Sequence, residues 1–408
     1  MKTHFKGLDV LRGLGIFILL MMHTAFYHYD GLYDLDLNNP PLIVTIIGLL
    51  LMFAGIFAMI SGFVHATQYR YKQNTLGYSN KQIMRYSLFS ALSILIVAYL
   101  YFIFTGPGLV NMATKSMNNS IIVEWINSGV LSGSNWDRIL YVDSLVMIGM
   151  NIALLGCIYL WIQKVAKHKQ AWFSLFFALL LFVISLIRLP LYEIYMNAID
   201  SDNALVILAL NWFVNKNNPI LPFLAFGLIG QALALFYIEK GYKTCRNVAL
   251  IEGSFMFIVG VILYIVLPDT MLERSIDMIW YAIMMAQFGL FQLIFIFFIK
   301  LYDQSKKQSM NIVSRALSRF SCAGLTIFFF ESIFSALIHR GLLIFMPNLV
   351  IGLWGSLLFG LCLALFWTFI LFLWEKKHYK YSIEYIISHA LARVGHSHKQ
   401  YKLEGKQV

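Results

Sequence analysis

Long runs of apolar residues constrain this chain more than any other feature of its sequence. A run of about 20 apolar residues can cross the roughly 30 Å hydrocarbon core of a bilayer as an α-helix. Inside lipid, only helices and closed barrels satisfy every backbone polar group. The sequence therefore predicts an all-α fold, a polytopic bundle of about ten transmembrane helices. The predicted spans lie at about 8–29, 42–66, 84–106, 139–162, 172–194, 219–238, 248–268, 279–300, 320–344 and 350–374.

The composition excludes an ordinary soluble domain. Of the 408 residues, 60% are hydrophobic and 12% are charged, and the mean hydropathy is +0.72, whereas about a quarter of the residues in a soluble domain are charged. The net charge is +11, but the basic residues form short clusters between apolar runs rather than one patch. We therefore expect membrane lipids as partners and no nucleic acid. The four cysteines show no metal-ligand spacing, so we expect no metal.

The distribution of basic residues predicts the orientation of the spans. With the N-terminus in the cytoplasm and alternating spans, most of the 31 Lys and Arg residues fall on the cytoplasmic side, as the positive-inside rule requires. Both termini are then cytoplasmic. Residues 1–376 form the transmembrane domain, and residues 377–408 form a tail whose apolar spacing predicts an amphipathic surface helix. Interfacial helices are also expected at 121–126 and 204–214 on the outer side.

The first span carries ionisable residues where a purely structural span would carry leucine. Arg12 and His23 are eleven positions apart, so at 100° per residue they lie within about 20° of one helix face. Asp9 and Asp30 lie close to the same stripe. His23 is about 16 Å deeper along the helix axis than Arg12. Because an ionisable side chain at the bilayer centre costs at least about 2.5–3.5 kcal/mol, this face is a candidate catalytic site.

A motif in this span resembles the opening helix of a known superfamily. It consists of Leu8 and Asp9, then Leu11-Arg12-Gly13-Leu14, and finally His23. The run is similar to that of the transmembrane acyltransferases of the acyltransferase-3 type, and of bacterial proteins like the catalytic domain of heparan-alpha-glucosaminide N-acetyltransferase. Two weaker similarities are Asn218 to Leu224, and Ser318 to Ser321 leading to Glu331. The resemblance implies acyl-CoA as co-substrate, with Arg12 and His23 associated with donor handling and catalysis.

His23 and Arg12 also suit acyl transfer by their chemistry. Histidine is the usual general base because its pKa lies nearest to working pH. Arg12 lies near the cytoplasmic surface, where its fork of donors suits the phosphates of CoA, and we place Asp9 in the same donor site. In the alternative interpretation His23 is a hydrogen-bonded packing residue. Arg12 is then a snorkelling arginine that pairs with Asp9 at i,i+3.

Two further residues are candidates for catalysis. His28 lies near the outer end of the first span, and relatives of the glucosaminide type use a histidine there, so the resemblance makes His28 a candidate base facing the acceptor. Glu331 lies eleven residues into a span that begins at about Phe320, which matches the depth of His23. Its carboxylate is therefore a candidate to orient the imidazole, as in a triad. The alternative is a structural or protonated glutamate.

Acidic residues lie mostly on the predicted outer side. Asp30, Asp143 and Arg188 are candidates for binding a polar acceptor such as a sugar, although ordinary solvated loops would show the same charge pattern. Glu252 follows Arg246 close to the inner surface, and we interpret it as part of an interfacial ion pair.

Together these features predict a multi-pass acyltransferase of the bacterial cytoplasmic membrane that modifies cell-envelope carbohydrate. It would move an acyl group, most simply acetyl, from cytosolic acyl-CoA to a hydroxyl or amine of a small-molecule or glycan acceptor outside; homo-oligomerisation is left open. The alternative is a proton-coupled transporter or flippase of small metabolites or lipid-linked sugars, with His23 and Glu331 as a proton relay. Against it, the sequence shows no matching halves or broken helices. A non-enzymatic scaffold would leave Arg12 and His23 unexplained.

Overall fold

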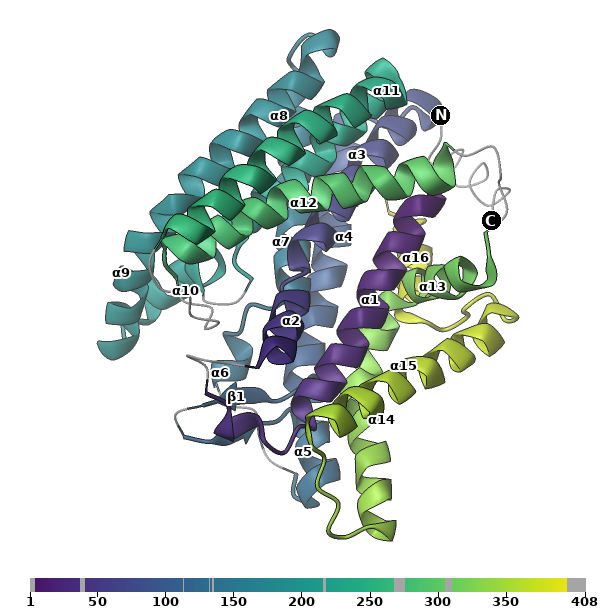
Figure 1. The fold of residues 1–408 in the computed structure, drawn as a ribbon. Helices are drawn as coiled ribbons and strands as arrows, with labels where there is room; N and C mark the ends of the chain where they lie inside the picture. The colour runs from purple at the N-terminus through teal and green to yellow at the C-terminus, as the bar shows by residue number, and fades with distance from the viewer. Residues whose placement is uncertain are drawn as a thin grey trace.

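Helices make up most of the computed structural model, which describes residues 4–36, 41–112, 114–131, 133, 136–215, 218–267, 276–304 and 310–394. Among these residues the strands are β1 Leu109–Asn111 and β2 Ser116–Asn118, which pair antiparallel in the loop after α4. Long helices pack against one another at several tilts (Figure 1). The predicted all-α class is confirmed.

Eight helical stretches of the described chain are long and apolar enough to cross a membrane. The polytopic membrane bundle predicted from the sequence is therefore confirmed. The eight stretches are α1 Lys6–Tyr27, α4 Asn80–Leu100 with η2 Tyr101–Thr105, α7 Ser144–Ile162, α8 Lys167–Ile184 with η3 Ser185–Ile187 and α9 Arg188–Asp200, α11 Ile220–Val266, α12 Met278–Asp303, α14 Gly324–Phe345, and α15 Leu353–Glu375. The other described helices are η1 Leu32–Asp34, α2 Leu42–Leu51, α3 Ala54–Leu76, α5 Ile121–Ser128, α6 Trp136–Ile139, α10 Ala204–Val214, α13 Ile312–Cys322 and α16 Ile383–Leu391.

The longest helix, α11, accounts for two of the predicted spans. Its 47 residues correspond to about 70 Å of helix, more than twice the hydrocarbon thickness. The helix is interrupted at Gly241, where φ is 82° and ψ is 170°. Glycine suits this position because other residues are strained there. The break lies between the predicted spans 219–238 and 248–268, so α11 contains two halves of membrane length.

The second predicted span, 42–66, is not one continuous helix. The chain forms α2, breaks, and then forms α3, which continues beyond the predicted end. At the break, Phe53 stacks on Phe291 with ring centroids 5.4 Å apart. A Cβ on Gly55 would lie 2.6 Å from the Phe226 ring. Tight packing against α11 and α12 therefore holds the chain in this bent path.

Glycines bring the central helices into backbone contact. A Cβ on Gly62 in α3 would lie 1.9 Å from the carbonyl oxygen of Gly227 in α11. A Cβ on Gly13 in α1 would lie 1.8 Å from the carbonyl oxygen of Leu317 in α13. Small residues at helix interfaces allow this close approach in membrane proteins. The second contact fixes α1 against α13, which leads directly into α14.

One end of the bundle gathers the start of α1 and the ends of α12 and α15. The backbone N–H groups of Lys6 and Gly7 donate to the Asp303 carboxylate at 3.0 and 2.9 Å, and the start of α1 lies beside the end of α12 (Figure 1). Arg319 of α13 pairs with Glu375 at 2.8 Å. Three helix ends that the alternating topology places in the cytoplasm are thus near one another, and the compartment they face remains a prediction.

The short helices expected at 121–126 and 204–214 are present as α5 and α10. The helix expected in the tail is present as α16. The rest of the predicted tail, from residue 395 onward, lies outside the described residues. Whether these helices lie on a membrane surface remains a prediction.

Candidate active site

The His23 imidazole and the Glu331 carboxylate lie in hydrogen-bond contact. α1 supplies His23 and α14 supplies Glu331, and the distance from Nδ1 to Oε1 is 2.9 Å. Glu331 is buried, with 3% of its surface exposed, while the His23 side chain keeps 23% of its surface exposed. The fold therefore brings together the two residues that the sequence placed at equal depth.

Tyr101 is a third member of this cluster, and the sequence analysis did not identify it. Its hydroxyl donates to the same Oε1 atom of Glu331 at 3.1 Å. Because this oxygen accepts from Tyr101, we assign the proton of the His23 contact to Nδ1, which donates as well. Nε2 then carries a lone pair, as a general base requires.

A π-helical turn, η2, presents Tyr101 to Glu331. η2 continues directly from α4, and its bond from the Gly106 N–H to the Tyr101 carbonyl oxygen measures 2.6 Å. π-Turns occur frequently at functional sites. η2 packs on α14. Tyr101, the first residue of η2, still continues α4, because its N–H donates to the Val97 carbonyl oxygen.

Arg138 fastens the chain around η2. Its guanidinium is 1% exposed and donates to the Phe102 carbonyl oxygen at 2.8 Å. It also donates to the carbonyl oxygens of Pro107 and Asn118 at 2.9 and 2.6 Å. Burial lowers the pKa of Arg138 to about 10, so the group stays cationic at neutral pH. Arg138 thus connects η2 to the loop that follows it.

Asp143 lies within electrostatic range of His23 and Tyr101. Its carboxylate caps the start of α7 by accepting a hydrogen bond from the Val146 N–H at 2.8 Å, a common role for aspartate at this position. Asp143 is buried, with 7% of its surface exposed. The structure therefore places this candidate acceptor residue beside the His23 cluster, with one oxygen already bound to the helix.

Arg12 and Asp9 belong to a second polar cluster, nearer the start of α1. Arg12 Nε donates to the Ser321 hydroxyl at 2.7 Å, and Nη2 donates to the Ser321 carbonyl oxygen at 2.6 Å. The Ser321 hydroxyl donates to Asp9 at 3.2 Å, and His4 Nδ1 lies 3.3 Å from the other Asp9 oxygen. The expected pairing of Arg12 with Asp9 therefore runs through Ser321.

Both clusters connect α1 to the segment formed by α13 and α14. The chain breaks between these helices at Ala323, where φ is −130° and ψ is 29°, so the predicted span 320–344 is not continuous. Ser321 lies before the break and Glu331 lies after it. Along α1 the clusters are about 16 Å apart, which sets the length of a ligand that contacts both.

His28 and Asp30 lie at the far end of α1 and make other contacts. The His28 ring packs on His339 and Phe359, with centroids 4.6 and 5.1 Å away. The Asp30 N–H donates to the Ile351 carbonyl oxygen at 3.1 Å. The Ile351 N–H donates to the Asp30 carboxylate at 2.5 Å. Asp30 therefore ties the end of α1 to the segment before α15, and roles for these two residues in acyl transfer remain predictions.

Arg188 lies in α9, at the left edge of the bundle and away from α1, which runs through the middle of the view (Figure 1). It is fully buried and donates to the carbonyl oxygens of Val214 and Asn215 at 3.3 and 2.6 Å. Its guanidinium also lies 4.5 Å from the centroid of the Trp280 ring. Arg188 joins α9, α10 and α12, so the structure does not bring it together with His23 as an acceptor site would require.

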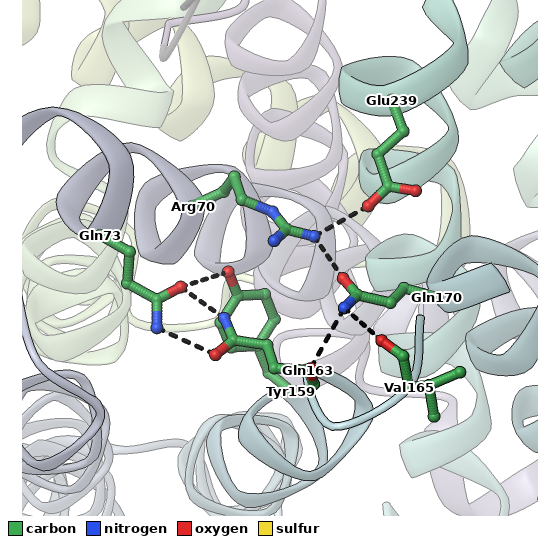
Figure 2. Close-up of polar contacts among 7 residues, drawn as sticks. All are labelled: Arg70, Gln73, Tyr159, Gln163, Val165, Gln170 and Glu239. Atoms are coloured by element: carbon green, nitrogen blue, oxygen red, sulfur yellow. Dashed lines mark hydrogen bonds and ion pairs between the residues drawn. The ribbon is translucent and has the colours of Figure 1, made fainter. Parts of the chain in front are cut away.

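A larger polar network joins α3, α7, α8 and α11 (Figure 2), and the sequence analysis did not identify it. Arg70 donates to Gln170 at 2.6 Å and to Glu239 at 2.8 Å, and the Tyr159 hydroxyl donates to Gln73 at 2.9 Å. The Arg70 and Glu239 side chains are only 8% and 6% exposed. The available signal was Arg70 itself, an arginine next to a predicted apolar span. A buried and hydrogen-bonded ion pair restricts how these four helices pack.

An apolar cavity of about 470 Å³ lies between α1, α3 and α12, and its lining includes Leu14, Ile56 and Phe297. The polar clusters around His23 and Arg12 do not line it. Among the residues that the structure describes, no group of three or more His, Cys, Asp or Glu could hold a metal ion.

A comparison with protein-family models finds no match for this chain, and a search of curated proteins finds none. The resemblance of the first span to transmembrane acyltransferases therefore stays an interpretation of its motif. The function has to be argued from the two polar clusters along α1.

Proposed function

We propose that this protein is a membrane acyltransferase. It moves an acyl group, most simply acetyl, from cytosolic acyl-CoA to a hydroxyl or amine of a sugar-containing acceptor on the extracytoplasmic face. We place it in the bacterial cytoplasmic membrane, where it modifies carbohydrate of the cell envelope. The observation that carries this proposal is the 2.9 Å contact between His23 Nδ1 and Glu331 Oε1. Ionisable residues within membrane spans cost free energy, and those that a protein keeps there usually serve its function.

In this proposal His23 is the general base. Its Nε2 accepts the proton of the acceptor hydroxyl while the hydroxyl oxygen attacks the thioester carbonyl carbon. The carbon–sulfur bond then breaks, and His23 returns the proton to the leaving thiolate, so the imidazole is neutral again after one turnover. Glu331 fixes the tautomer and stabilises the transient imidazolium, and Tyr101 fixes the carboxylate through its hydrogen bond at 3.1 Å.

The cluster around Arg12 is the proposed donor end of the site. Its guanidinium is held in one orientation by the two bonds to Ser321, at 2.7 and 2.6 Å. A fixed guanidinium favours an anionic group such as a phosphate. The acyl-carrying arm would then extend about 16 Å along α1 to His23.

The test is turnover of labelled acetyl-CoA by the purified protein in detergent or liposomes. We expect donor hydrolysis, self-acylation or transfer to an added sugar, and we expect His23→Ala to abolish all three. His168→Ala is the control, because His168 is an exposed histidine at the start of α8 and belongs to neither polar cluster of α1. Protein that neither binds nor consumes acetyl-CoA would refute the proposal.

A second candidate function is proton-coupled transport or flipping of a small metabolite or lipid-linked sugar. The break between α2 and α3 within the second span favours it, because many transporters build their sites from discontinuous helices. His23 and Glu331 would then relay protons. Solute accumulation driven by a proton gradient in liposomes, without consumption of acetyl-CoA, would support transport.

A further inference from the structure

Glu252 is a deeply placed carboxyl group outside both polar clusters of α1. It lies in the second half of α11, eleven residues after the break at Gly241, which corresponds to about 16 Å of helix. Both carboxyl oxygens are buried, and neither makes a hydrogen bond of normal geometry with a described residue. The sequence interpretation of Glu252 as part of an interfacial ion pair is wrong, because no cationic group of the described chain acts on it.

The carboxyl group lies next to a close crossing of α11 and α12. A Cβ on Gly289 would lie 2.2 Å from the Gly253 carbonyl oxygen, and a Cβ on Gly260 would lie 2.3 Å from the Ala286 nitrogen. The two backbones therefore touch from Gly253, the residue directly after Glu252, to Gly260. Such packing leaves no room for side chains between the helices, so the surroundings of the carboxyl group are fixed.

Gln292 of α12 is the polar neighbour of Glu252. Its side chain is fully buried, and its Nε2 donates to the Phe288 carbonyl oxygen at 3.1 Å. Its Oε1 is buried without a hydrogen-bond partner among the described residues. In the part of the chain that the structure describes, the pair thus holds three buried acceptor oxygens, two on Glu252 and one on Gln292, without a donor in normal hydrogen-bond geometry. The Gln292 side chain still interacts with the carboxyl group. Gln292 carries no charge, so it cannot neutralise a carboxylate.

A proton on Glu252 would remove both unfavourable features of this site, the buried negative charge and the carboxyl oxygens without a hydrogen-bond donor among the described residues. An ionised carboxylate at the bilayer centre costs at least about 2.5–3.5 kcal/mol, and an unpaired buried charge is relieved by neutralisation. A proton on Glu252 removes the charge and supplies the missing donor. We propose that Glu252 and Gln292 form a proton-binding site within the membrane, in which Glu252 carries its proton at neutral pH. The site is separate from the His23 base and does not depend on acyl transfer.

Protonation gives Glu252 a reactivity that ionised carboxylates lack. The acid oxygen adds to the central carbon of a hydrophobic carbodiimide while its proton moves to a carbodiimide nitrogen, and the product rearranges to a stable N-acylurea. An exposed glutamate with a pKa of about 4.3 is protonated in only about one molecule in 500 at pH 7. Selective labelling at pH 7 therefore reports a carboxyl group that has kept its proton.

The experiment treats the full-length protein in detergent with dicyclohexylcarbodiimide at pH 7 and analyses its peptides by mass spectrometry. We expect one reagent added to the peptide that contains Glu252, and no addition there in Glu252→Gln. Glu375, which pairs with Arg319 at 2.8 Å, is the matched control and should stay unlabelled. We expect Glu252→Gln to leave the melting temperature unchanged, because the amide replaces a neutral acid of the same shape, and Glu252→Lys to lower it.

Two results would overturn the proposal. Labelling of Glu252 that appears only near pH 4 would identify an ordinary carboxylate. A large fall in melting temperature for Glu252→Gln would show that the fold requires the negative charge. Acetyl-CoA turnover is measured on the same preparations, and its absence in the wild-type protein would count against the proposed function while leaving this site standing.

Discussion

Replacing Glu331 by glutamine tests the candidate active site most directly. Glu331 Oε1 accepts hydrogen bonds from His23 Nδ1 at 2.9 Å and from Tyr101 at 3.1 Å. In Glu331→Gln the shape is kept, but the side-chain amide can donate to Nδ1 of His23. That contact favours the tautomer with its proton on Nε2, which removes the lone pair that a base needs. In a Ser-His-Asp triad the equivalent change lowers kcat by about 10⁴.

The expected loss follows from the contacts. General base catalysis contributes about 10² to 10⁴, so we expect Glu331→Gln to lower kcat within that range. The KM for the acyl donor should change little, because the Arg12 cluster is untouched. Tyr101→Phe removes one hydrogen bond to a charged group, worth about 1.5–3 kcal/mol, and should lower kcat by about 10- to 100-fold.

The assay measures initial rates of labelled acetyl transfer, with melting temperatures recorded on the same preparations. The double variant His23→Ala/Glu331→Gln should be no slower than His23→Ala, because residues that act as a unit are not additive. Full activity in Glu331→Gln, or additive losses in the double variant, would refute the assignment.

Three further predictions concern the fold and the donor end of the site. Arg138→Ala should lower the free energy of unfolding by about 3–9 kcal/mol, because three carbonyl acceptors lose their donor at about 1–3 kcal/mol each; thermal unfolding in detergent measures this, and Arg138→Lys should recover part of it. Gly241→Ala should cost about 1–3 kcal/mol in the same assay because of its backbone conformation, and an unchanged midpoint would contradict that reasoning. Arg12→Ala should raise the KM for acetyl-CoA more than it lowers kcat, with Ser321→Ala showing a smaller effect of the same kind; steady-state kinetics with an unaltered KM would exclude Arg12 from the donor site.

Helical periodicity predicted the polar face of the first span because α1 is one continuous helix. The predicted polar face carries Arg12 and His23, and both residues contact the segment formed by α13 and α14. The depth of Glu331 was counted from Phe320, whereas α14 begins at Gly324 after a break. Glu331 reaches His23 because α14 packs beside α1, which the count along the sequence did not establish.

The remaining features depend on information that hydropathy and spacing lack. Tyr101 was missed because its contact with Glu331 depends on the packing of η2 against α14, which hydropathy and spacing do not show. Arg188 was misplaced because hydropathy shows which segments cross the membrane but not which ones are neighbours. Glu252 was misread because its setting depends on contact with α12 at Gly289, far away in the sequence.

Because the chain breaks at Ala323, the two polar clusters of α1 contact two separate helices, α13 and α14. Arg12 donates two hydrogen bonds to Ser321 of α13. His23 makes one hydrogen bond to Glu331 of α14. A rotation of α14 about Ala323 would move the Glu331 carboxylate away from the His23 imidazole and leave the Arg12–Ser321 hydrogen bonds unchanged. Such a hinge would break and re-form the His23–Glu331 contact while the Arg12–Ser321 contacts stay in place.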